Sequence, residues 1–244
     1  MLTPMRILVV ISGKRKQHEA LERALKFAEY NDVHIHLFNS IYEPVMELTD
    51  VLSSDHRKEM KKQFLSDRYL YMDTIAETLD KKNIKCSVRV VWHRELHEAI
   101  EEVVVELKPD LVIKRISADA GSINPFTMPV DRHLLRFCPT PLLLVNSASW
   151  SDGPLLAAVD PMTDDETHIA LNHKILEYTK MLGHLIGSPM HTVNTFQTPS
   201  MSPTTYLPGI DYDLIRKDTA SAHNQKMQTL LEKHEVAAEN MHSS

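Results

Sequence analysis

At 244 residues, with 43% hydrophobic and 25% charged residues, the chain has an ordinary globular composition and enough apolar side chains for one large domain or two modest ones. Its net charge of −6 gives no reason to expect a nucleic acid or an anionic membrane surface as a partner. No apolar run approaches the roughly 20 residues that span a bilayer, and two cysteines, Cys86 and Cys138, suggest no disulfide framework, so a reducing cytoplasm fits best.

Short apolar runs alternate with helical patterns along the first 146 residues. The runs are typical of strands buried on both faces, and the helical segments carry apolar side chains at i, i+3 and i+4. The predicted strands are 6–11, 33–41, 86–91, 110–114 and 142–145, and the predicted helices are 17–30, 54–79, 96–107 and 130–137. This alternation indicates an α/β fold with a parallel sheet and helices on both faces.

The same pattern begins again after a linker, SWSDGP (149–154). Its elements are a strand over 155–160, a helix over about 165–183, a strand over 190–196 and a helix over 211–234. We therefore expect two domains, a five-stranded one at 1–148 and an incomplete repeat with two strands and two helices at 153–244. Because such a repeat leaves a sheet edge and apolar helix faces uncovered, we expect another chain or further residues to complete it, or part of it to be disordered.

The order of these elements resembles the universal stress protein family, and in particular its tandem, E-type members. Three motifs carry the resemblance: IYEPVMELTDVLSSDHRKEMKK (41–62), VVWH (90–93) and DRHLLRFCPTPLLLV (131–145). The resemblance implies a doubly wound, Rossmann-like sheet of order 3-2-1-4-5 and a second domain that is cut short. It also implies a role in stress response, pairing of domains within one chain or between copies, and an adenine-nucleotide site in some branches.

Nucleotide-binding members of that family carry G-x2-G-x9-G-[ST] after strand four and an aspartate at the end of strand one. Glycines allow backbone N–H groups to approach phosphate oxygens beside a helix N-terminus. In this chain the loop has one glycine, Gly121, and the final Gly-[ST] pair falls on Met128 and Pro129; proline has no N–H to donate. Ser12 stands at the strand-one position. We therefore expect that the first domain does not bind ATP.

Asp160 occupies the corresponding strand-one position in the second domain. The resemblance makes it the one candidate cofactor-binding residue, and it implies that ATP could bind only in a complete second domain. An aspartate that follows a strand is also typical of a turn or of a helix N-cap, so the residue by itself does not decide between the two roles.

Histidines suggest a second candidate chemistry. His93 and His97 stand four residues apart, which can bring two imidazoles to one helix face, but the spacing fixes no third ligand and we expect no metal. His34 and His36 share one face of a predicted strand, so we expect them to be partly buried and hydrogen-bonded, unless this strand lies near a sheet edge. The chain contains no P-loop, nucleophile elbow or dinucleotide-binding motif, so we expect no catalytic residue.

Basic residues flank the loop that lacks its glycines. Lys114, Arg115, Arg132 and Arg136 form either a solvated face or a basic patch for an acidic ligand.

Two hypotheses of different classes follow. The first is a non-enzymatic stress-response protein that acts by binding a small molecule and by domain pairing or homodimer formation. The alternative is an adenine-nucleotide-binding protein with weak ATP hydrolysis, whose site lies in the complete second domain.

Overall fold

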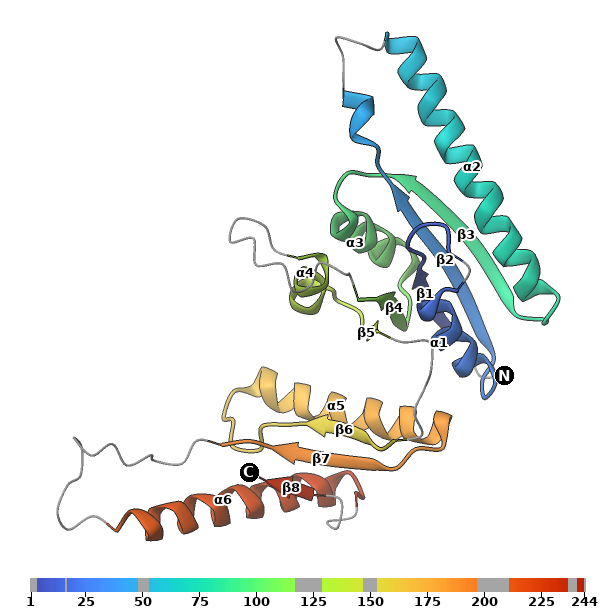
Figure 1. The fold of residues 1–244 in the computed structure, drawn as a ribbon. Helices are drawn as coiled ribbons and strands as arrows, with labels where there is room; N and C mark the ends of the chain where they lie inside the picture. Colours follow the sequence, from blue (N-terminus) through green and yellow to red (C-terminus); the bar gives the residue numbers. More distant parts are fainter. Residues whose placement is uncertain are drawn as a thin grey trace. The chain divides into compact units, whose positions relative to one another are not determined.

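A computed structural model of the chain describes residues 4–15, 17–47, 53–116, 129–146, 153–196, 211–236 and 241–243. The chain divides into two compact units, Met1–Trp150 and Ser151–Ser244, each of which has its own sheet (Figure 1). None of the described helices combines the length and hydrophobicity that a bilayer-spanning segment requires.

The first unit is a doubly wound, five-stranded parallel sheet. Its strands are β1 (Met5–Val10), β2 (Val33–Ile41), β3 (Lys85–Trp92), β4 (Leu111–Arg115) and β5 (Leu142–Val145), and its helices are α1 (Glu19–Ala28), η1 (Pro44–Glu47), α2 (Ser54–Asp80), α3 (Leu96–Leu107) and α4 (Val130–Phe137). The strand order is β3-β2-β1-β4-β5, and every neighbouring pair is parallel, which confirms the predicted sheet.

The core lies on both faces of this sheet because β1, its central strand, is apolar at successive positions. Leu8 and Val10 face α3 and α4, where they join a buried cluster with Phe38 and Val112. The opposite face is covered by α1 and α2 (Figure 1). Alternate residues of a strand point to opposite faces, so a continuous apolar run is what a strand covered on both sides needs.

The long helix α2 has 27 residues, and its two halves differ in burial. Met72 and Leu79 in the C-terminal half are buried against the sheet, whereas no described residue of the first 16 is buried. The helix begins at a cap, where the Oγ of Ser53 accepts a hydrogen bond from the backbone N–H of His56 at 3.3 Å. The N-terminal half therefore runs beyond the packed core and reaches η1 (Figure 1).

The described residues of the second unit form three parallel strands and two helices: β6 (Leu155–Ala158), α5 (Glu166–Ile186), β7 (Met190–Asn194), α6 (Tyr212–Lys233) and β8 (Met241–Ser243). The sheet order is β6-β7-β8, so the expectation of two strands was wrong. The third strand has only three residues, which is too short for an alternating pattern to mark it in the sequence. A small core of Ala157, Leu176, Met227 and Leu231 joins the strands to both helices.

Candidate functional site

The carboxyl edge of β1 and β4 is the place where the sequence pattern locates a nucleotide. Arg115, the last residue of β4, donates from Nε to Oε1 of Glu19, the first residue of α1, at 3.0 Å. The space between Ser12, His18, Glu19 and Arg115 has a volume of about 10 Å³, which is about the minimum for a single water molecule. Among the described residues, this space is therefore too small for a nucleotide, while the loop that follows β4, residues 117–128, lies outside them.

The charge at the start of α1 also disfavours a phosphate. A helix N-terminus ordinarily attracts an anion, but here the Glu19 carboxylate already occupies that position. The pKa of Glu19 is lowered, first by the hydrogen bond to its own backbone amide and then by Arg115, while partial burial opposes the shift. An incoming phosphate would therefore meet a carboxylate whose negative charge is held in place.

The basic patch considered as one of two alternatives for Lys114, Arg115, Arg132 and Arg136 does not form among the described residues. The side chain of Lys114 points into the interior, only 1% of the residue is exposed, and Nζ lies 2.6 Å from Oδ1 of Asp131 in α4. Arg115 is held by Glu19, so only Arg132 and Arg136 lie on the surface. Neither alternative holds for Lys114, because the alternation of side chains along β4 turns Lys114 toward Asp131 and the core.

The glycine-loop prediction falls largely outside the described residues, since Gly121 and Met128 lie in the range 117–128. Pro129 is described and stands at the N-cap of α4, with an extended backbone and no side-chain capping bond. This is the position at which a backbone N–H would otherwise face an anion.

Asp160 follows β6, at the carboxyl end of the second sheet. Its Oδ1 accepts the backbone N–H of Met162 at 3.1 Å, which closes a local turn. Its backbone N–H donates to Oδ1 of Asn172 at 3.1 Å, and the Asn172 amide donates back to its carbonyl at 2.6 Å. A hollow of about 400 Å³ lies beside it, lined also by His168 and Asn194. Contact between Asp160 and a cofactor stays a prediction.

The two histidines considered as metal ligands have different partners. The ring of His93 lies 2.8 Å from the Glu95 carbonyl through Nδ1, and 3.7 Å from Glu98 through Nε2. The ring of His97 instead packs on His133, with centroids 4.1 Å apart. Among the described residues no three His, Cys, Asp or Glu side chains are grouped as a metal ion would require.

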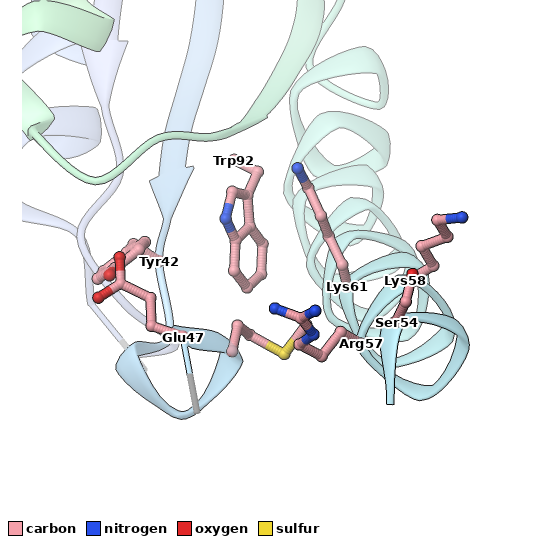
Figure 2. Close-up of a pocket in the computed structure, with 8 residues that line it drawn as sticks. Tyr42, Glu47, Ser54, Arg57, Lys58, Lys61 and Trp92 are labelled. Carbon is pink, nitrogen blue, oxygen red and sulfur yellow. The ribbon is translucent and has the colours of Figure 1, made fainter. Parts of the chain in front are cut away.

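Another hollow lies in the first unit, at the carboxyl ends of β2 and β3, and it was not predicted from the sequence. It has a volume of about 310 Å³ and opens between η1, the first turns of α2 and the end of β3. Figure 2 shows the cations of α2 on one side, Tyr42 and Glu47 on the other, and Trp92 between them. Its lining residues are Tyr42, Met46, Glu47, Ser54, Arg57, Lys58, Lys61 and Trp92.

The register of the sheet brings the two aromatic residues of this hollow together. Ile41 of β2 pairs with Trp92 of β3, so Tyr42 follows directly at the same edge. The Tyr42 and Trp92 rings meet edge to face, with centroids 6.2 Å apart and planes at 62°. The ring of Phe64 in α2 packs near the Trp92 ring, with centroids 6.2 Å apart, which connects the helix to the strand end.

Charged groups surround these rings. Lys61 places its Nζ 5.3 Å from the centroid of the Trp92 ring, and Arg94 lies over Tyr42 at 5.8 Å. The pKa of Tyr42 is raised, mainly by its hydrogen bond to Glu47. The Glu47 carboxylate also faces Arg94 at 3.5 Å, so it already has partners. The only signal for this site in the sequence is a large aromatic residue at the end of β3 and another directly after β2.

A family profile and individual relatives both identify the same protein family. A sequence profile of the universal stress protein family matches residues 4–146. Universal stress protein E of Escherichia coli K12 is 29% identical over 229 residues, which are 93% of this chain and 72% of that protein. The universal stress protein E homolog of Haemophilus influenzae is 25% identical over 242 residues, covering 97% and 78%.

Solved structures share the fold. The crystal structure of a putative universal stress protein from Pseudomonas aeruginosa has a TM-score of 0.71 at 22% identity and covers 98% of this chain and 73% of its own. A universal stress protein from Archaeoglobus fulgidus has a TM-score of 0.59 at 13% identity, with coverage of 98% and 75%.

Proposed function

Since the chain belongs to the universal stress protein family, we propose that it is a stress-response protein that acts without catalysis, through ligand binding and through pairing of domains or of copies. Its family membership confirms the resemblance inferred from residues 41–62, 90–93 and 131–145. We further propose a cytoplasmic location, which the two free thiols of Cys86 and Cys138 support.

The observation that carries this proposal is the filled edge between β1 and β4. Arg115 and Glu19 form an ion pair with 27% and 20% of their side-chain surfaces exposed, and the space beside it is about 10 Å³. A nucleotide would have to separate this pair and bring its phosphates against a carboxylate. This ion pair supports the proposal that the first unit keeps the scaffold of the family and does not bind ATP.

We propose that the second unit is the N-terminal part of another domain of the same type, over 153–244. The order β6, α5, β7, α6 and β8 repeats that of β1, α1, β2, α2 and β3, and the three strands pair in the same order in both sheets. Two domains of one type in a chain support intramolecular pairing, and a homodimer is the other form of self-association that we propose.

A second candidate function is adenine-nucleotide binding in the second unit, with weak ATP hydrolysis. Asp160 at the end of β6 and the adjoining hollow of about 400 Å³ favour it. The turn that Asp160 closes with Met162 is the competing explanation for this residue.

Calorimetric titration with ATP, together with an assay of phosphate release, tests both functions. We expect neither saturable heat nor phosphate release from the wild-type chain. Asp160→Asn removes the charge and keeps an oxygen for the Met162 amide, so binding that this variant loses would support the second function. ATP binding or hydrolysis could instead depend on Arg115 and not on Asp160. A change in Arg115→Ala with no change in Asp160→Asn would contradict the first function.

A further inference from the structure

We propose that the hollow between η1, α2 and the end of β3 is a binding site for a small anion with a flat apolar body, such as an aromatic carboxylate. This inference rests on the ligand-binding part of the proposed function and names the site and the class of ligand. It requires neither the filled edge between β1 and β4 nor any pairing of domains.

The walls of the hollow supply a surface for a flat apolar group. Tyr42 and Trp92 are partly exposed at the ends of neighbouring strands (Figure 2). Met46 of η1 also lines the hollow. Aromatic and thioether groups bind flat rings by close contact and stacking. A volume of about 310 Å³ is at the lower end of the range for small-molecule sites, about 300–1,000 Å³. It accommodates a fused two-ring compound.

The opposite wall supplies positive charge from a single helix. Arg57, Lys58 and Lys61 line the hollow from the first two turns of α2, where the helix dipole adds to their effect. Arg57 and Lys61 are four residues apart, and like charges at this spacing repel each other. An anion bound between them would relieve that repulsion.

The described carboxylates balance this charge only in part. The one carboxylate near Lys58 is that of Asp55, at 3.9 Å, with both side chains almost fully in water. The Nε of Arg57 is buried and has no hydrogen-bond partner among the described residues. A buried donor without a partner is unfavourable, and the charge of this guanidinium is therefore not balanced by a hydrogen bond at Nε.

The shape of the charge distribution decides between classes of ligand. Glu47 stands across the hollow from the α2 cations and is held by Tyr42 and Arg94. A polyanion that filled the whole space would meet this carboxylate, whereas a ligand with one anionic end can place its ring against Trp92 and its charge toward Arg57. A single anionic group on a flat body therefore fits better than a nucleic acid or a bare phosphate.

The experiment uses the full chain and the indole N–H of Trp92 as its reporter. The sequence has two tryptophans, and Trp150→Phe leaves Trp92 as the only indole signal in a ¹⁵N-labelled NMR spectrum. The probe is 2-naphthoate, titrated at low salt. The comparison compounds are its uncharged methyl ester, octanoate as an anion without a ring, and inorganic phosphate.

We expect a saturable shift of the Trp92 indole signal with 2-naphthoate, and binding at least about fivefold weaker for each comparison compound, since each loses one of the two interactions. Lys61→Gln should weaken 2-naphthoate about five- to tenfold. Lys62→Gln removes the same charge from the same helix at an exposed position that does not line the hollow. It should leave the affinity unchanged.

Equal losses in Lys61→Gln and Lys62→Gln would show only bulk attraction and overturn the site. The absence of a saturable shift with 2-naphthoate, in a chain whose spectrum is that of a folded protein, would overturn it as well. Equal or tighter binding of phosphate or octanoate would overturn the class of ligand. None of these outcomes depends on the ATP titration, so a failure here and a failure of the proposed function are distinguishable.

Discussion

A buried histidine at the centre of the first sheet makes its stability depend on pH. His36 lies on β2 between Leu8 of β1 and Ser87 of β3, and only 6% of the residue is exposed. Its Nδ1 is 2.7 Å from the Ser87 hydroxyl, while its Nε2 is buried with no hydrogen-bond partner among the described residues. A second proton would place a charged N–H donor in an apolar setting. Burial first, then the neighbouring His34 and Arg6, lowers the pKa of His36 to about 4.

The sign and size of the effect follow from proton linkage. The unfolded chain binds a proton at this residue near pH 6.5, whereas the folded chain does so only near pH 4. The folded chain therefore keeps its full free energy of unfolding above pH 6.5, where His36 is neutral in both states, and loses part of it as the pH falls toward 4. The full difference corresponds to about 3 kcal/mol, and the part lost between pH 7 and pH 5 is about 2 kcal/mol.

Urea unfolding at pH 7 and pH 5 measures this loss. In a Trp150→Phe background, Trp92 fluorescence follows the first unit. We expect the free energy of unfolding to fall between pH 7 and pH 5 in both proteins. The fall should be about 2 kcal/mol smaller in His36→Gln than in the parent. The comparison of two pH values within each variant cancels any constant effect of the substitution itself.

The control is His56→Gln, which replaces an exposed histidine at the start of α2. It should keep the pH dependence of the parent. If His36→Gln and the parent lost equal free energy between pH 7 and pH 5, His36 would titrate alike in the folded and unfolded chains. The argument from burial would then be wrong.

Two further substitutions test packing. Asp131→Asn removes the carboxylate charge that faces the buried Lys114 at 2.6 Å and should lower the free energy of unfolding in urea by about 3–5 kcal/mol. The double variant Lys114→Met, Asp131→Leu should regain most of that loss. An equal loss in both variants would contradict the reasoning. Gly183→Ala should lower the Tm although alanine is the better helix former by about 1 kcal/mol, because its Cβ would lie 2.8 Å from the backbone oxygen of Ser188; a higher Tm would show that propensity outweighs the close contact.

The elements that depend on local patterns could be predicted from the sequence. The strands over 33–41 and 142–145 and the helices over 96–107 and 130–137 have the predicted bounds, because continuous apolar runs and helical spacing are properties of neighbouring residues. The strand β8 could not be predicted in this way, since its three residues are a strand only through their pairing with β7.

The candidate site depends on contacts between distant residues, and sequence reasoning missed it for that reason. Lys58 and Lys61 have the spacing of an ordinary solvated helix face. They become candidate binding residues only because the pairing of Ile41 with Trp92 places an indole ring beside them. Similarly, Lys114 stood at the end of a predicted strand beside other basic residues, and only its contact with Asp131, 17 residues later, shows that its side chain belongs to the core.

The end of β4 explains why the anion site lies elsewhere on the sheet. Successive residues of a strand point to opposite faces, so Lys114 meets Asp131 of α4 on one face and Arg115 meets Glu19 of α1 on the other. Each flanking helix thus begins with a carboxylate that is already paired with a basic residue of β4. A phosphate at this edge would have to compete with two intramolecular carboxylates. At the ends of β2 and β3, Arg57 and Lys61 have no ion pair with a described carboxylate, so positive charge is available to a ligand there.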